Sequence, residues 1–233
     1  MEDGISVAEE TLERLFSLFP FIDEDCRQLV WLNTTVVQVK KGNYIYREDD
    51  SPIGFICLLE GNAKVVKTGI NGRGNIVRLV RPMGLLGYRA LFAEENYRSG
   101  ALTLDDSVIA IIDKDAFFKV MRSNADLSLH ILKLIASELG DSHLRMVTLT
   151  QKYLRGRLAD AILSLVEIYG FDSDGKTIPV TLSRADLAQL SSMTTSNAIR
   201  TFSAFVSEGL VSNINKRIAV LDLQGLHKVS ELG

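Results

Sequence analysis

Hydrophobic and polar residues alternate over short distances in the middle of the chain, from about residue 34 to residue 113. Runs rich in β-branched and aromatic residues are separated there by glycine or asparagine turns, where positive φ is easily reached. Many short strands with no helix between them are typical of an antiparallel barrel or roll. The pattern predicts such a roll, with strands over 35–39, 54–59, 63–67, 76–80 and 107–112.

Helical periodicity flanks the predicted roll on both sides. Two short helical patterns precede it within 9–31, and Asp23 is a plausible N-cap for the second. A long helical pattern follows from about 115 to 152, and its N-terminal half offers Leu127, Ile131 and Leu134 as one apolar face. This face predicts a helix that lies on the roll.

A second, narrower apolar stripe follows the same long pattern in alternating steps of three and four residues. Heptad spacing of this kind lets two helices pack side by side along a common axis. A helix that only covered its own roll would need a single apolar face, and that simpler interpretation stays open. The stripe predicts a homodimer, in which the polar Ser142 weakens the seam but helps to fix its register. The seam consists of Leu132, Ile135, Leu139, Ser142, Met146, Leu149 and Tyr153.

The last third of the chain carries the signals of a winged helix. After a helix from about 158 to 170 and a short strand near 178–181, Ser183 caps a helix over 184–190, with Asp186 as its capping-box partner. Thr194 caps the next helix after a very short turn, and two helices joined in this way form a helix-turn-helix. The runs 210–214 and 218–221 then flank basic residues at a hairpin tip, which completes the winged helix.

The second helix of this motif has two faces. An apolar face is expected to pack into the domain core, and it consists of Ala198, Ile199, Phe202, Phe205 and Val206. The opposite face is polar, and such helices enter the major groove with their N-terminal residues at base edges. The predicted DNA-binding residues, including two at the hairpin tip, are Thr194, Thr195, Ser196, Asn197, Arg200, Lys216 and Arg217.

Each of these side chains suits a different part of DNA. Arg200 matches the O6/N7 pair of guanine, and Asn197 matches the N6/N7 pair of adenine. The threonines and free backbone N–H groups at the helix start suit phosphate oxygens, as do Lys216 and Arg217. The alternative is a solvated polar face on a winged helix that binds protein.

The composition of the chain restricts the possible classes of protein but does not indicate a function. The chain has 233 residues and a net charge of −3, and residues 150–233 hold 9 Lys and Arg against 8 Asp and Glu, so charge alone does not indicate nucleic-acid binding. The lack of a long apolar stretch, the acidic N-terminus and two distant cysteines together predict a cytoplasmic protein without membrane partner or disulfide. No catalytic motif is present, and His130, His143 and His227 lie outside the roll, so an enzyme is not expected.

Three stretches resemble the Crp/Fnr superfamily of bacterial transcription regulators. Residues 87–92 with Arg98 and Ser99 resemble its phosphate-binding cassette, and residues 156–159 resemble the segment after its interdomain hinge. Residues 182–188, continued through Arg200 and 208–211, resemble its DNA-binding core. The resemblance implies an α+β fold with an effector-sensing cupin-like β-roll (1–113), a dimerisation helix (114–153) and a winged-helix DNA-binding domain (154–233).

The resemblance also implies an allosteric function. Dimers of this kind bind a small effector in the roll, which changes how the winged helices meet a pseudo-palindromic double-stranded operator; RNA polymerase is a further candidate partner. Arg98 and Ser99 match the pair that holds a cyclic phosphate, and Tyr88 replaces the glutamate that accepts from the ribose hydroxyl. The implied effector-binding residues are Gly87, Tyr88, Arg89, Arg98, Ser99 and Ser142. Structural ion pairs of the two arginines over a filled pocket are the alternative.

The departures from the family leave the effector open. Cys26 and Cys57 cannot supply the four ligands of an iron–sulfur cluster, so no such cluster is expected. A cyclic nucleotide, haem, another small molecule and no effector at all remain as alternatives. For haem, His143, Met146 and His130 are conceivable ligands. Ser196 stands where the family commonly has a glutamate. An operator that differs from the usual half-site should follow, because serine cannot replace a carboxylate that accepts from cytosine N4.

Overall fold

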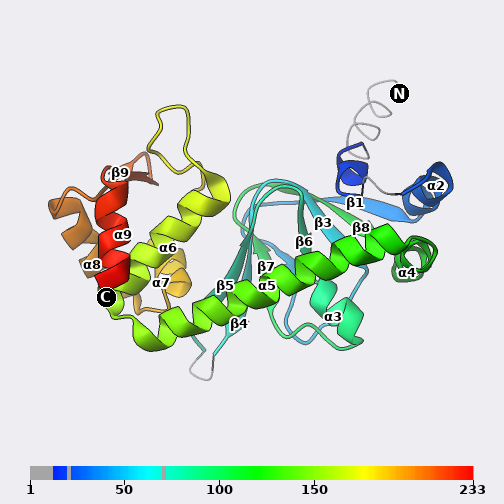
Figure 1. The fold of residues 1–233 in the computed structure, drawn as a ribbon, viewed down its shortest axis with the longest axis horizontal. Helices are drawn as coiled ribbons and strands as arrows, with labels where there is room; N and C mark the ends of the chain where they lie inside the picture. Colours follow the sequence, from blue (N-terminus) through cyan, green and yellow to red (C-terminus); the bar gives the residue numbers. More distant parts are fainter. Residues whose placement is uncertain (1–12, 20–21, 70–71, 233) are drawn as a thin grey trace. The chain divides into compact units, whose positions relative to one another are not determined.

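The computed structural model describes residues 13–19, 22–69 and 72–232, which divide into two compact units (Figure 1). The first unit comprises residues 1–67 and 78–139, and the second comprises 68–77 and 140–233. The three-part division at residues 113 and 153 stays a prediction. In the described ranges, no helix is both long and apolar enough to cross a bilayer.

Two four-stranded sheets, in the orders β1-β8-β3-β6 and β2-β7-β4-β5, make up the roll. Pairs such as β1–β8, β3–β8 and β4–β7 are antiparallel, which confirms the predicted antiparallel β-roll. Three strands of three or four residues were too short to predict. The strands are β1 (Thr34–Val39), β2 (Tyr44–Tyr46), β3 (Phe55–Glu60), β4 (Ala63–Thr68), β5 (Gly74–Val80), β6 (Gly84–Leu86), β7 (Gly100–Thr103) and β8 (Ser107–Ile112).

Strand β3 shows how the first unit builds two cores. Its side chains point alternately to opposite faces, as in any strand. Ile56 and Leu58 lie in the cluster that fills the roll, whereas Phe55 and Cys57 belong to a second cluster on the outer face of the sheet. Because both faces are covered, the strand is apolar almost throughout.

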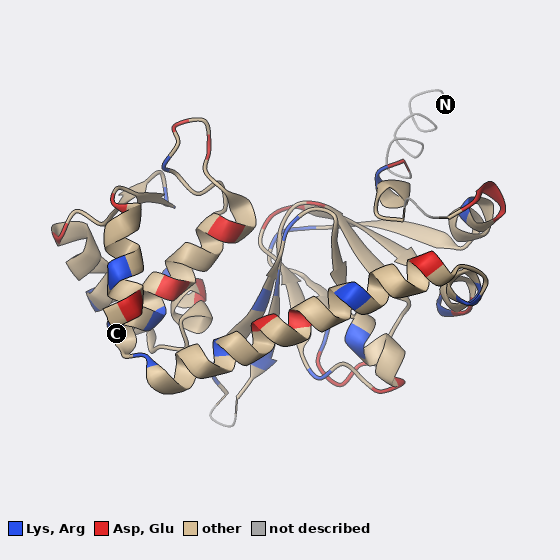
Figure 2. Cartoon of the chain, viewed as in Figure 1, with Lys and Arg blue, Asp and Glu red and all other residues tan. Residues whose placement is uncertain are grey.

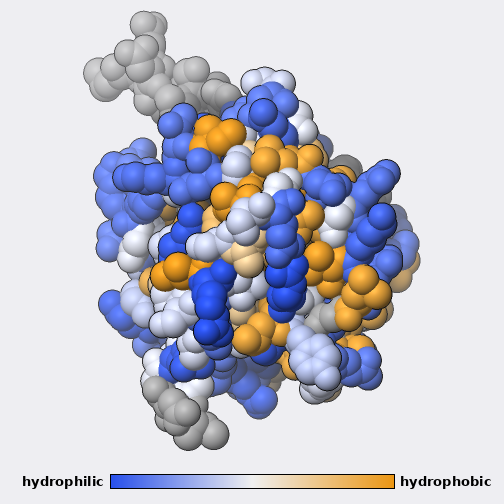
Figure 3. Space-filling model, turned by 90° about the vertical axis from the view of Figure 1, so that its left-hand side faces the viewer, coloured by the Kyte–Doolittle hydropathy of each residue, from blue (hydrophilic) through white to orange (hydrophobic). Residues whose placement is uncertain are grey.

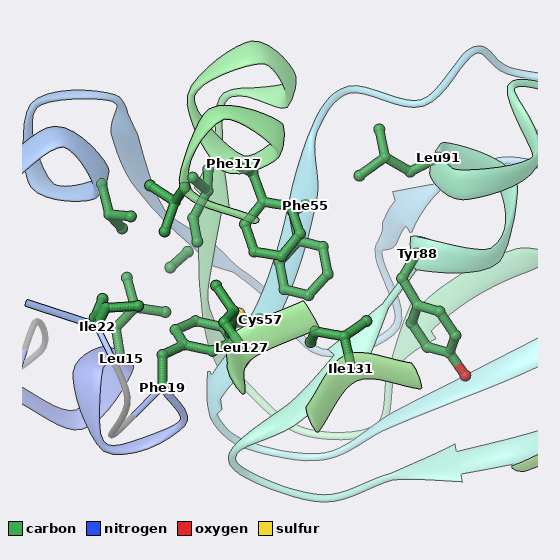
Figure 4. Packing of buried hydrophobic residues seen from close by; sticks show 14 of the residues in the cluster. Leu15, Phe19, Ile22, Phe55, Cys57, Tyr88, Leu91, Phe117, Leu127 and Ile131 are labelled. Carbon is green, nitrogen blue, oxygen red and sulfur yellow. The ribbon is translucent and has the colours of Figure 1, made fainter. Parts of the chain in front are cut away.

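Helices cover this outer face: α2 (Glu24–Leu32), α4 (Lys114–Ser123) and the start of α5 (Ala125–Gln151). Phe117 of α4 stacks on Phe55 with ring centroids 3.7 Å apart, and Leu127 and Ile131 of α5 are buried in the same cluster (Figure 4). Asp23 caps α2 as predicted. The first helical pattern predicted within 9–31 lies partly outside the described residues.

The single helix predicted over 115–152 is wrong, because the chain breaks between α4 and α5 at Asn124. The backbone of Asn124 is extended, and its side-chain Oδ1 accepts a hydrogen bond from the Leu127 N–H, which starts a new helix. Leu134 is exposed rather than packed on the roll. The break lets α4 and α5 follow separate directions over one core.

The second unit contains helices α6 (Leu154–Tyr169), α7 (Arg184–Leu190), α8 (Thr195–Ser207) and α9 (Leu223–Leu232), with the hairpin β9 (Val211–Ile214) and β10 (Arg217–Val220). The helix predicted from about residue 158 starts four residues earlier, and α9 was not predicted. The strand predicted near 178–181 is reduced to one bridge between Thr177 and Ala219. The helix-turn-helix and its hairpin are confirmed.

Candidate nucleic-acid interface and effector cassette

Side-chain caps fix the two helices of the helix-turn-helix. The Ser183 hydroxyl accepts from the Asp186 N–H while the Asp186 carboxylate accepts from the Ser183 N–H, so both halves of the predicted capping box are present. Thr194 caps α8 by accepting from the Asn197 N–H at 3.2 Å. Its hydroxyl therefore already has a structural role at the start of the helix.

Helix α8 buries one side and exposes the other. Ala198, Thr201, Phe202 and Phe205 are buried, and α8 packs through this side against α6 and α7. The prediction that Ile199 and Val206 also face the core is wrong, because 45% and 42% of their surfaces are exposed. The exposed side of the helix consists of Thr195, Ser196, Ile199, Arg200, Ser203, Val206 and Ser207.

Arg200 is held on the exposed side by its neighbour. One guanidinium nitrogen donates to Asn197 Oδ1 at 2.9 Å, and Asn197 lies one turn earlier on the helix. Within Thr195–Ser207 there is no acidic residue, so Arg200 is the one charge of the helix. The two side chains predicted to read bases thus lie together.

The two basic residues at the hairpin tip have different surroundings. Asn215 and Lys216 form the turn with φ of 50° and 67°, as the tightest hairpins require. Lys216 is exposed there, whereas Arg217 opens β10 and donates to the Asp172 carboxylate at 2.8 Å. Lys216 is accordingly the better placed of the two to meet a phosphate.

Two further arginines support α8 and were not foreseen from the sequence. Arg155 of α6 makes a two-pronged ion pair with Glu208, at 2.8 and 2.6 Å, directly after α8 ends. The hydrogen bond from Arg155 lowers the pKa of the Glu208 carboxyl. Arg184 lies over the Phe202 ring, 4.1 Å from its centroid. Because these partners are far apart along the chain, no local sequence pattern reveals them.

The predicted cassette opens on a glycine that the backbone requires. Gly87 precedes helix α3 (Tyr88–Ala93) with φ of +69°. A Cβ at this position would lie 2.8 Å from the ring of Tyr97. Tyr97 in turn stacks on Tyr46, with centroids 3.9 Å apart, and burial raises the pKa of Tyr46 to about 12. Tyrosine rings therefore pack tightly beneath the cassette.

Gly87→Ala should lower the free energy of unfolding by about 2–4 kcal/mol, from the left-handed backbone together with the overlap with Tyr97. Gly42 is the matched control, since its φ is +79° but nothing lies within 4 Å of its missing Cβ. Gly42→Ala should cost only the backbone part, about 1–2 kcal/mol. Urea unfolding measures both variants, and equal losses would show that Tyr97 does not crowd the cassette.

The two cassette arginines share one carboxylate. Arg89 forms an ion pair with Glu95, and Arg98 donates to the same carboxyl at 2.6 Å with 72% of its side chain exposed. The hydrogen bond from Arg89 lowers the pKa of Glu95, with a smaller contribution from Arg98. Ser99 is half-buried next to them. An anion at Arg98 would have to compete with Glu95 for its guanidinium.

Tyr88 links the cassette to helix α5. The residue is buried, and its hydroxyl points away from the apolar cluster (Figure 4). It donates to the Glu138 carboxylate on α5 and accepts from Arg78 at 3.2 Å. Arg78 also forms an ion pair with Glu138 and donates to the Leu85 carbonyl at 2.5 Å. This Tyr88–Arg78–Glu138 network was not predicted, because its members are far apart in the sequence.

The predicted dimer seam is exposed along most of α5. Leu139 and Met146 are 57% and 62% exposed, and charges of both signs are interspersed along the helix (Figure 2). Ile135 is an exception, since it packs partly against the apolar cluster on the outer face of the sheet. Tyr153 lies outside α5 as the N-cap of α6, so its inclusion in the helical seam is wrong. Ser142 is exposed in the part of α5 that belongs to the second unit.

Within one chain, His143 and Met146 cannot be the two axial ligands of the same haem. His143 and Met146 are exposed on one side of α5, three residues apart. Axial ligands must approach a porphyrin from opposite faces, which side chains adjacent on one helix surface cannot do. Cys57 is buried in the outer core, where burial raises the pKa of its thiol and disfavours the thiolate that binds metals.

Comparison with known proteins matches both units to described families. Residues 36–124 match the cyclic nucleotide-binding domain, and residues 156–229 match the Crp-like helix-turn-helix domain. The chain is 23% identical over 193 residues to the anaerobic regulatory protein of Bacillus subtilis, which covers 82% of this chain and 81% of that protein.

Two further matches cover similar lengths. The CRP-like cAMP-activated global transcriptional regulator of Mycobacterium tuberculosis is 21% identical over 192 residues, or 82% of this chain and 85% of that protein. The solved structure of FixK2 from Bradyrhizobium japonicum matches with a TM-score of 0.74 and 20% identity, over 84% of this chain and 96% of that one. The structural match shows a shared fold.

Proposed function

We propose that the chain, which belongs to the Crp/Fnr family of DNA-binding transcription regulators, acts as a homodimer. In this dimer the two α8 helices recognise the bases of an operator. The exposed side of α8 carries this proposal. It presents Arg200 and Asn197 beside hydroxyl groups, on a helix without acidic residues. A surface of that kind suits the major groove, where an acidic side chain would meet repulsion from phosphates.

The reading scheme assigns a separate role to each group. Arg200 donates two parallel hydrogen bonds to guanine O6 and N7, and Asn197 pairs with adenine or orients Arg200. Thr195 and the backbone N–H groups at the start of α8 contact phosphate, together with Lys216 at the wing tip. Ser196 predicts an operator different from the usual half-site of the family.

A dimer would contact DNA through two α8 helices. The exposed apolar residues of α5 pack against the same residues of a second copy, so the two α8 helices are related by a two-fold axis. A two-fold protein reads a pseudo-palindromic operator, with half-sites about one helical turn apart. RNA polymerase stays a predicted further partner.

Salt dependence distinguishes this function from a winged helix that binds protein. Fluorescence anisotropy with a labelled genomic fragment library should show binding that weakens steeply between 50 and 200 mM salt (~10³-fold for six phosphate contacts), because phosphate contacts release counterions. A winged helix that contacts only protein would show no retention on DNA at either salt concentration.

A second proposal concerns the roll. We infer that a small anionic effector binds at Arg98 and Ser99 and shifts the dimer between two states through the Tyr88–Arg78–Glu138 network. This network supports the inference, because it joins the cassette directly to α5, the helix of the dimer seam. An effector changes DNA affinity only if it binds one state better than the other.

Arg98→Ala should melt close to wild type, since an exposed ion pair contributes little to stability. Cyclic AMP, cyclic GMP and cyclic di-GMP are the ligands to add in thermal-shift and DNA-binding assays. We expect at least one to raise the melting temperature of wild type and change its DNA affinity, and to do neither with Arg98→Ala. A large loss of stability without any ligand effect would instead assign Arg98 to a structural ion pair.

A further inference from the structure

An exposed isoleucine stands among the polar residues of the reading helix. Ile199 is the fifth residue of α8, within the part of such a helix that reaches base edges. Nearly half of its surface is exposed, although isoleucine is among the residues most often fully buried. The three exposed residues one turn away from it on either side are Thr195, Ser196 and Ser203.

The surroundings of Ile199 favour a small apolar partner on DNA. The adjacent Arg200 supplies the only charge of the helix, and its neighbours offer only hydroxyl groups. Apolar side chains read one feature of the major groove, the C5-methyl group of thymine. On the side of the molecule that carries α8 and β9, hydrophobic side chains are interspersed with hydrophilic ones (Figure 3).

We propose that Ile199 is a specificity-determining residue that packs against the 5-methyl group of one thymine in each half-site. The inference rests on the proposed function and deepens it, since it adds an apolar base contact beside that of Arg200. Removing the methyl group should weaken binding about fourfold per half-site, which corresponds to ~0.8 kcal/mol for one buried methyl-sized group. Both half-sites together should give about fifteenfold.

The same helix offers a matched control. Val206 is also apolar and 42% exposed, and it lies seven residues further along nearly the same side. At a rise of ~1.5 Å per residue it is about 10 Å away from Ile199, beyond the segment that reaches base edges. Val206→Ala removes a similar amount of exposed apolar surface without touching the proposed contact.

The experiment begins with an operator selected from random DNA by the full-length wild-type protein. Each thymine of the half-site is then replaced by deoxyuridine, which removes only the methyl group, and affinities are measured by fluorescence anisotropy. Wild type and Val206→Ala should lose about fifteenfold at one symmetric pair of thymines. Ile199→Ala should bind the thymine and deoxyuridine operators equally well, while Ile199→Val should keep most of the difference.

The remaining outcomes contradict the proposal at distinct points. If wild type tolerates deoxyuridine at every position, or if Ile199→Ala keeps the full methyl dependence, the inference is wrong while sequence-specific DNA binding stands. If no sequence is selected at all, the proposed function fails and the inference fails with it. Circular dichroism should show that each variant is folded, as expected for substitutions of exposed residues.

Discussion

The double substitution Leu139→Lys and Met146→Lys should convert the dimer to monomers. Both side chains are more than half exposed in the single chain, so the substitutions leave its own core intact. In the dimer, four apolar side chains would be removed from the seam, each worth about 1.5 kcal/mol or more when buried. Lysines would also face lysines there. Sedimentation velocity at micromolar concentration should therefore show a monomer.

DNA binding should fail with the seam, because a monomer contacts only one half-site. We expect affinity for the palindromic operator to fall at least 100-fold, while the melting temperature stays near that of wild type at low concentration. Leu144→Lys is the control, since Leu144 is 71% exposed on the other side of α5 and should change neither property. A double variant that remains dimeric with unchanged affinity would rule out this seam.

Arg200→Ala should have the largest effect on sequence recognition. A two-pronged arginine–guanine contact contributes about 1–3 kcal/mol of discrimination, and a dimer makes it twice. Affinity for the selected operator should thus fall by about 30-fold to 10⁴-fold, and preference at one base pair per half-site should relax. Arg200→Lys should not restore it, because lysine lacks the planar two-pronged geometry.

Lys216→Ala should behave differently from Arg200→Ala. Lys216 lies in the turn at the tip of the hairpin, and we expect it to reach phosphate rather than base edges. Its removal should weaken binding to all sequences alike and reduce the salt slope by about one unit for every phosphate that the lysine neutralises. A change of base preference in Lys216→Ala would mean that the wing reads sequence.

The features that the sequence predicts correctly depend on local chemistry. The Ser183–Asp186 capping box and the Thr194 cap involve residues three positions apart, so the starts of their helices could be placed to within a residue. Turn glycines and alternation of apolar residues likewise indicated the roll. Short strands such as β2 and β6 escaped, because three residues carry too little pattern.

The features that were missed depend on the fold. Tyr88, Arg78 and Glu138 meet only once the cassette lies beside α5, and no spacing along the chain encodes that. The helical spacing of Ile199 from Phe202 and Val206 predicts that it faces the core. On a helical wheel centred on Ala198, Phe202 and Phe205, however, it lies toward the exposed side, and this signal was available in the sequence.

Selection of binding sites from random DNA, run in parallel on wild type and Arg200→Ala across a salt series, tests the central claim most directly. The account predicts that wild type selects a two-fold symmetric motif with a guanine in each half-site. Arg200→Ala should select the same motif with that guanine position relaxed, at every salt concentration. An identical motif and affinity for both proteins would contradict the account, because α8 would then not be the helix that reads the operator.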